Sequence, residues 1–197
     1  MFNELKTAQA GAYLLHKAGG TMHHIKLMKL LYLSDRLSWL ERDHSITGDE
    51  YYSLPYGPVL SKTLNLIRGE TLNHTKTAWE EWISDKENHQ VSIAKIVDEK
   101  DEYFWGELSL SDTDILDSVF EKYGHFDRFA LVELTHNPDI VPEWEDPKGG
   151  AKNKSKQSLR NKPKCNKSTD FLRERYDSRG PYPKFCVNTH FNLTVIV

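Results

Sequence analysis

The chain has 197 residues, of which 38% are hydrophobic and 28% charged, a balance typical of a soluble globular protein and unlike that of a membrane or wholly disordered chain. It holds no run of about 18 apolar residues, as a membrane-spanning helix needs, and its N-terminus lacks the layout of a secretory signal. We therefore expect a cytoplasmic protein in which Cys165 and Cys186 are reduced and form neither a disulfide nor a metal site.

Charge is divided unevenly along the chain. Residues 1–147 contain 14 Lys and Arg against 26 Asp and Glu, a net charge of −12, whereas residues 148–197 contain 12 against 3, a net charge of +9. The change falls at a Pro-Lys-Gly-Gly turn signal that begins at Pro147. This division predicts a folded domain over 1–147 and a basic tail over 148–197.

Two helices are predicted near the N-terminus. Apolar residues recur at three- and four-residue spacing after Asn3, and the pair Gly19-Gly20 supplies a stop for this first helix. Thr21 is suited to cap a second helix, in which the segment 27–33 is apolar almost all the way round. Such a segment indicates a buried, central helix.

A loop and a third helix are predicted next. Residues 47–58 mix turn residues with adjacent tyrosines, which indicates a short extended segment followed by a loop. Pro58 suits the first turn of a helix, because its missing N–H costs nothing there. This helix is predicted to run to Arg68, with Gly69 ending it.

The second half of the domain is predicted to begin with strands and end with helices. Aromatic and β-branched residues occur in patches over 78–108, which favours a few short strands in a small antiparallel sheet. Ser111 with Asp114 resembles a capping box for a helix that Gly124 closes, and a last helix is predicted over 126–136. The predicted fold class is mostly α with a small antiparallel β element, that is, a single α+β domain.

The predicted tail differs in character from the domain. Residues 151–168 are basic and polar with almost no large apolar side chain, so this stretch is predicted to be disordered by itself. Residues 185–197 are apolar and β-prone, which predicts either an edge strand or an exposed end. The basic charge supports only non-specific attraction to nucleic acid, because no DNA-binding motif accompanies it.

The sequence contains no motif of an enzyme, so we expect no catalysis, no cofactor and no metal. His23 and His24 are adjacent, face different ways on a helix and lack further ligands at a recognised spacing, so we interpret them as solvent-exposed. Lys26, Lys29 and Arg36 fall on one side of the second helix. They predict a basic stripe, which is either simply solvated or able to meet an acidic partner.

Three segments, in this order, resemble the Panacea domain of SocA-like antitoxins: KLMKLLYLSDRLSWLERDHSITGDEYYSLPYGPVLSKTLNLI, ELSLSDTDILDSVFEKYG and ALVELTHNPDIVPEW. The resemblance covers about residues 5–147. Residues that match the family pattern in these segments are Lys29, Leu30, Leu31, Tyr32, Asp35, Tyr56, Gly57, Pro58, Val59, Leu110, Tyr123, Gly124, His136 and Trp144.

The resemblance implies a mostly helical fold with a small β element, and an antitoxin that holds a partner protein toxin inactive by direct contact. Members of the family accompany many unrelated toxins, so the resemblance does not identify the toxin. We predict toxin contacts at Tyr56, Gly57, Pro58, Lys29 and Asp35, with the Gly-Pro pair alternatively shaping only a helix entry, and structural roles for Tyr32, Val59, Gly124, His136 and Trp144.

Two alternative functions stay open. One is a proteolytic adaptor that delivers the toxin to an AAA+ protease, as at least one member of the family does. The other is a nucleic-acid-binding regulator that acts through the basic tail, since residues 148–197 depart from the family pattern. None of these functions involves a membrane.

Overall fold

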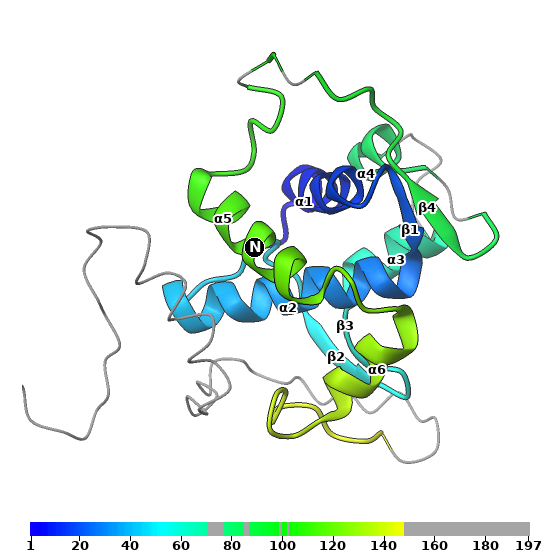
Figure 1. Ribbon diagram of the computed structural model, residues 1–197, viewed down its shortest axis with the longest axis vertical. Helices are drawn as coiled ribbons and strands as arrows, with labels where there is room; N and C mark the ends of the chain where they lie inside the picture. Colours follow the sequence, from blue (N-terminus) through cyan, green and yellow to red (C-terminus); the bar gives the residue numbers. More distant parts are fainter. Residues whose placement is uncertain (71–76, 85–86, 99, 102, 148–197) are drawn as a thin grey trace, which may run out of the picture. The chain divides into compact units, whose positions relative to one another are not determined.

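The structure, a computed structural model, describes residues 1–147 apart from 71–76, 85–86, 99 and 102 (Figure 1). The predictions for 148–197, including the disordered stretch and the strand at 185–197, lie outside the described residues. No described helix is long and apolar enough to span a membrane. Within the described residues the helices are α1 (Glu4–Lys17), α2 (His24–Arg42), α3 (Ser61–Arg68), α4 (Ala78–Trp82), α5 (Leu110–Tyr123) and α6 (Arg128–His136), and the strands are β1 (Thr21–His23), β2 (Tyr51–Leu54), β3 (Gly57–Leu60) and β4 (Gln90–Ser92). The predicted fold class, mostly α with small antiparallel β elements, is confirmed.

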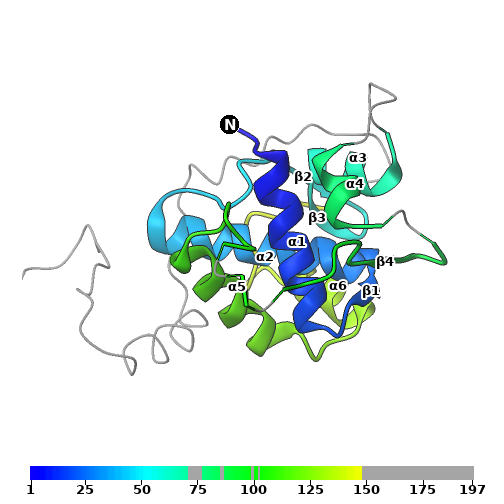
Figure 2. The ribbon, with the colours of Figure 1, turned by 90° about the horizontal axis from the view of Figure 1, so that it is seen from above.

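The central element is α2, in which every residue from 27 to 38 is buried. Figure 1 shows α1 and α5 on one side of α2 and the β2–β3 strands with α6 on the other, and Figure 2 shows α1 crossing over α2. The predicted buried spine is therefore confirmed. The predicted cap is wrong, because Thr21 belongs to β1 and the Nδ1 atom of His23 accepts the hydrogen bond from the Ile25 amide instead.

The β2–β3 hairpin corrects the prediction that a helix begins at Pro58. Pro58 lies in β3 opposite Ser53, and α3 begins three residues later. A two-stranded sheet has only edge strands, which tolerate a residue without an N–H. The start of α3 is held by Asp49, whose carboxylate accepts hydrogen bonds from the amides of Lys62 and Thr63.

The described residues of 78–108 contain one strand rather than the predicted sheet of its own. β4 pairs antiparallel with β1, from before α2, and α4 replaces the strand predicted around its two tryptophans. Thr77 and Glu80 form a capping box, and the three-residue spacing of Trp79 and Trp82 buries both against α1. Gly11 of α1 lies against the same segment, and a Cβ atom there would lie 2.7 Å from Ile83 Cδ1 and 3.5 Å from the Trp79 ring.

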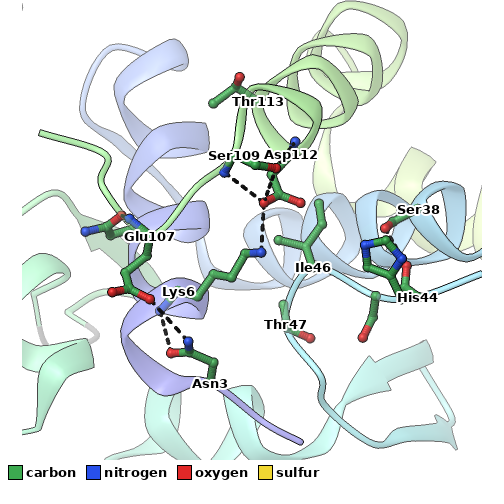
Figure 3. A network of polar contacts seen from close by, with 12 residues as sticks. Asn3, Lys6, Ser38, His44, Ile46, Thr47, Glu107, Ser109, Asp112 and Thr113 are labelled. Atoms are coloured by element: carbon green, nitrogen blue, oxygen red, sulfur yellow. Dashed lines mark hydrogen bonds and ion pairs between the residues drawn. The ribbon is translucent and has the colours of Figure 1, made fainter. Parts of the chain in front are cut away.

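The predicted capping box of α5 lies two residues too late in the sequence. Ser109, not Ser111, is the cap, and Asp112, not Asp114, completes the box. Asp112 is 1% exposed and forms an ion pair of 2.8 Å with Lys6 (Figure 3). A second ion pair of 2.8 Å, with Arg42, joins α5 to α2 as well as to α1. Although burial alone would raise it, hydrogen bonds from Lys6, Ser109 and Arg42 lower the pKa of Asp112 to about 2.

The sequence predicted that the rings of His23 and His24 face different ways on a helix, and this prediction is wrong. The rings of His23 and His24 stack with centroids 4.8 Å apart, and His89 stacks on both at 5.8 Å. Burial and the neighbouring cations and imidazoles lower the pKa of His23 to about 4. This cluster joins the start of α2 to the β1–β4 pair. In the described part of the chain, no group of His, Cys, Asp or Glu side chains is arranged to hold a metal ion.

Candidate functional site

The candidate site is built around Lys29, which lies in the buried stretch of α2. Its Nζ atom donates a hydrogen bond to the carbonyl oxygen of Pro58 over 2.8 Å. This bond connects α2 to the β2–β3 hairpin. The side chain is only 1% exposed, and burial lowers the pKa of the Lys29 ammonium group to about 7. Lys29 therefore supports the hairpin from inside the domain.

The hairpin tip approaches α2 and α6 so closely that residue 57 must be glycine. Gly57 has a φ of +90°, a conformation that side chains disfavour. A Cβ atom at this position would lie 2.7 Å from Lys29 Nζ, 2.7 Å from Thr135 Oγ1 and 3.3 Å from His136 Nε2. The tip, formed by Pro55 and Tyr56, is thus seated on a packed base of polar side chains.

The segment after α6 closes over the other strand of the hairpin. The ring of Trp144 stacks on His136 at 4.1 Å, and its Nε1–H donates to the carbonyl oxygen of Leu54 over 3.3 Å. The amide of Glu145 also donates to Ser53 Oγ over 3.4 Å. Burial, assisted by the charge of Lys29, lowers the pKa of His136.

Glu143 ties the same segment to α2. Its Oε1 atom accepts hydrogen bonds of 2.7 Å from the hydroxyl of Tyr32 and from Nε of Arg36. Lys29, Tyr32 and Arg36 share one face of the helix and all point to this side of the domain. The prediction of a solvated basic stripe is wrong, because Lys29 and Arg36 are buried and Lys26 donates to the carbonyl oxygen of Gly124 over 2.6 Å.

Asp35 organises the loop that leads into the hairpin. Its buried carboxylate accepts hydrogen bonds from the amides of Ile46 and Thr47, from the Thr47 hydroxyl and from the Tyr51 hydroxyl. Burial raises the pKa of Asp35 to about 6 despite these hydrogen bonds, which oppose the shift. Asp35 therefore fixes the entry to β2 from within the core.

The structure brings together four of the five residues that were predicted to contact a toxin. Tyr56 is 67% exposed at the hairpin tip, while Gly57, Pro58 and Lys29 lie buried directly behind it. Asp35 lies further along α2 and reaches the loop before β2. Of these five, Tyr56 presents its side chain to solvent, and the others hold the hairpin beneath it.

The residues predicted to be structural occupy positions around the same hairpin or at a helix end. Tyr32 bonds to Glu143, Val59 is buried in β3, and His136 stacks on Trp144. Gly124 is the C-cap of α5, as predicted. Sequence reasoning missed Thr135 and Glu143; the spacing of Lys29, Tyr32 and Arg36 indicated a common helix face but not which distant residues would meet it.

Comparison with known proteins identifies a family. The family model described as antitoxin SocA-like, Panacea domain, matches residues 27–145, which is more than half of the chain. The matched range contains α2, the hairpin, α6 and the segment that closes on the hairpin, so it includes the whole candidate site. Neither the comparison with curated proteins nor that with solved structures gives a match.

Proposed function

Because the chain belongs to the family of SocA-like antitoxins with a Panacea domain, we propose that it is the antitoxin of a toxin–antitoxin system and neutralises a protein toxin by binding it directly. This role is a binding role and requires no catalytic step by the chain.

We assign the hairpin tip as part of the toxin-binding surface. The assignment rests on the position of Tyr56. Its aromatic side chain is exposed at the end of a hairpin that Lys29, Gly57 and Trp144 hold in place. Tyrosine is enriched among residues that dominate interface energies, and a preorganised tip loses little entropy when it binds. Lys29 and Asp35 contribute by positioning the hairpin and its loop.

The proposal is tested by co-expression with the product of the adjacent open reading frame, placed under an inducible promoter. Full-length chain is expected to restore growth and to co-purify with that product. Tyr56→Ala is expected to weaken the complex by at least about tenfold, the effect of an interface residue worth about 1.4 kcal/mol. Tyr103→Ala is the matched control, because Tyr103 is also a highly exposed tyrosine but lies in the segment between β4 and α5.

The results separate the alternatives. A neighbour that is toxic but is neither bound nor neutralised by the full-length chain contradicts the proposal for that pair. Rescue that disappears in a host lacking an AAA+ protease, while the complex still forms, supports the adaptor instead. If Tyr56→Ala and Tyr103→Ala bind as well as the unaltered chain, the toxin docks on another surface.

A further inference from the structure

The central helix α2 begins with a histidine side chain as its cap. His23 is the N-cap residue, and its Nδ1 atom accepts a hydrogen bond from the amide of Ile25 over 3.2 Å. A ring nitrogen accepts such a bond only with a free lone pair, so the cap requires the neutral imidazole with its proton on Nε2. The side-chain oxygen of serine, threonine or asparagine, which are common at this position, accepts the same bond whether or not the solution is mildly acidic.

Two further histidines surround this cap. The ring centroids of His23 and His24 lie 4.8 Å apart, and His89, in the turn before β4, stacks with both at 5.8 Å. The carbonyl oxygen of His89 accepts hydrogen bonds from the His24 amide over 2.9 Å and from His24 Nδ1 over 2.8 Å. Because a carbonyl oxygen only accepts, His24 holds a proton on Nδ1 and keeps this bond when its ring becomes charged. His23 differs, because protonation removes its acceptor.

The turn that carries His89 has an unfavourable backbone conformation. Asn88 has a φ of +48° and His89 a φ of +63°, a left-handed region that glycine occupies more easily than residues with side chains. Glu87 and Gln90 exchange backbone hydrogen bonds of 3.0 and 2.7 Å on either side of them. The stacking of His89 on the other two rings therefore helps to hold a turn that is strained by itself.

The surroundings of His23 disfavour a positive charge on its ring. Burial lowers the pKa of His23 to about 4, together with the two neighbouring imidazoles and Arg128, at the start of α6. Asp127, the N-cap of α6, lies near Arg128 and Lys26, and its carboxylate accepts two amide hydrogen bonds of its own helix. The N-terminus of α2 adds a partial positive charge, which also opposes a cation at its cap.

We propose that His23 is a pH-sensitive cap, which fastens the start of α2 and the turn before β4 at neutral pH and releases both when mild acid protonates its ring. This inference concerns the opening of the domain and does not depend on the antitoxin role. His23 binds its proton more weakly in the fold than in the unfolded chain. The stability that the cap contributes is therefore lost as the pH falls from 6.5 towards about 4.

Denaturant unfolding of the full-length chain at pH 7, 6 and 5 tests the proposal. His23→Asn keeps a side-chain acceptor at the cap and removes the titrating ring, so it should be about as stable as the unaltered chain at pH 7. Between pH 7 and pH 5 the folded-to-unfolded ratio of the unaltered chain should fall about tenfold further than that of His23→Asn. His125→Asn is the matched control and should follow the unaltered chain, since His125 is exposed between α5 and α6 and packs on Phe126.

Hydrogen exchange at the Ile25 amide shows where the effect arises. After correction for the intrinsic exchange rate at each pH, protection of this amide should fall between pH 7 and pH 5 in the unaltered chain and stay constant in His23→Asn. His23→Ala lacks the acceptor, so it should show low protection at both pH values. Its folded-to-unfolded ratio at pH 7 should lie about fivefold below that of His23→Asn. Circular dichroism at pH 7 verifies that each variant is folded.

Three results would overturn the proposal. Parallel stability curves for the unaltered chain and His23→Asn from pH 7 to pH 5 would show that His23 does not sense acid. An equal change in His125→Asn would show a general effect of removing a histidine. If His23→Ala is as stable at pH 7, and as protected at Ile25, as His23→Asn, the side chain of residue 23 contributes no cap.

Discussion

Lys29 Nζ donates to the carbonyl oxygen of Pro58 over 2.8 Å in the interior of the domain. This bond joins the central helix to the strand that follows the exposed tip, so the position of Tyr56 depends on a buried cation. Burial lowers the pKa of that cation to about 7, and both the charged and the neutral amine can donate the bond. The hairpin is thus held by a group that titrates near neutral pH.

The Lys29 pKa predicts an unusual dependence of stability on pH. A lysine whose pKa falls from 10.5 in the unfolded chain to about 7 in the fold binds its proton more weakly when folded. Stability should therefore rise as pH increases from 7 to 9, where the unfolded chain still holds the proton. Lys29→Met removes the titrating group, so the variant should lack this rise. Denaturant unfolding of both proteins at pH 7, 8 and 9 measures the difference.

The comparison between the two proteins isolates Lys29 from the other groups that titrate in this range. At pH 7 the variant is expected to lie within about 2 kcal/mol of the unaltered protein, because the loss of the hydrogen bond is offset by removal of a buried charge. Parallel stability curves from pH 7 to pH 9 would show that Lys29 keeps an ordinary pKa in the fold.

Gly57→Ala is expected to be among the most damaging single changes at the site. The added Cβ atom would contact Lys29 Nζ and Thr135 Oγ1 at 2.7 Å, in a backbone conformation that already disfavours alanine. We expect a loss of about 2–4 kcal/mol in the free energy of unfolding, together with weaker toxin binding. Denaturant unfolding and the co-purification assay measure the two effects.

Gly19→Ala separates the clash from the backbone strain. Gly19 has a φ of +86°, close to that of Gly57, but a Cβ atom added there would have no neighbour within 4 Å. Its replacement is expected to cost only about 1–2 kcal/mol and to leave binding unchanged. Equal losses in the two variants would mean that the packing behind the tip contributes nothing to the requirement for glycine.

Helices were predicted correctly where a local sequence pattern defines them. The predictions failed where residues distant in the sequence decide the structure. The apolar run 27–33 indicated a buried helix by itself. Pro58 suits both an edge strand and the start of a helix. In the structure it lies in β3, and α3 starts later, where Asp49 caps it from outside the helix. Trp79 and Trp82 favour strands by propensity. They lie in α4 instead, where their three-residue spacing places both on the face that packs against α1.

The candidate site could be predicted only in part for the same reason. Tyr56 and Gly57 stand next to each other in the sequence, and the turn residues of 47–58 already indicated a loop there. The burial of Lys29 and its bond to Pro58 could not be read from its sequence neighbours, because the hairpin that covers it begins 22 residues later. The same holds for Glu143, which meets Tyr32 across 111 positions.

The buried carboxylate of Asp112 is expected to hold α1, α2 and α5 together. Asp112→Ala leaves Lys6 and Arg42 without this shared acceptor and should lower the free energy of unfolding by about 3 kcal/mol. Asp114→Ala, on the exposed side of the same helix, should change it by less than about 0.5 kcal/mol. Denaturant unfolding at pH 7 compares them, and equal effects would contradict a structural role for the ion pairs.

If the domain ends at residue 147, as the sequence predicts, residues 148–197 can be removed without loss of the fold. The family match ends at residue 145, and the contacts of Glu143, Trp144 and Glu145 with α2 and β2 lie within 1–147. A chain of residues 1–147 is expected to unfold cooperatively, to retain toxin binding and to neutralise the toxin. A chain of residues 1–136 is the matched control, since it lacks the closing segment and should lose several kcal/mol of stability and its affinity for the toxin.

Comparing these two truncations with the full-length chain decides what the tail does. If residues 1–147 fold but no longer neutralise the toxin, the basic tail takes part in the function and the domain alone is not the antitoxin. If only the full-length chain binds nucleic acid, with an affinity that falls steeply as salt rises, the tail adds a separate electrostatic activity. Retained neutralisation by 1–147 places the whole antitoxin function on the domain that contains the β2–β3 hairpin.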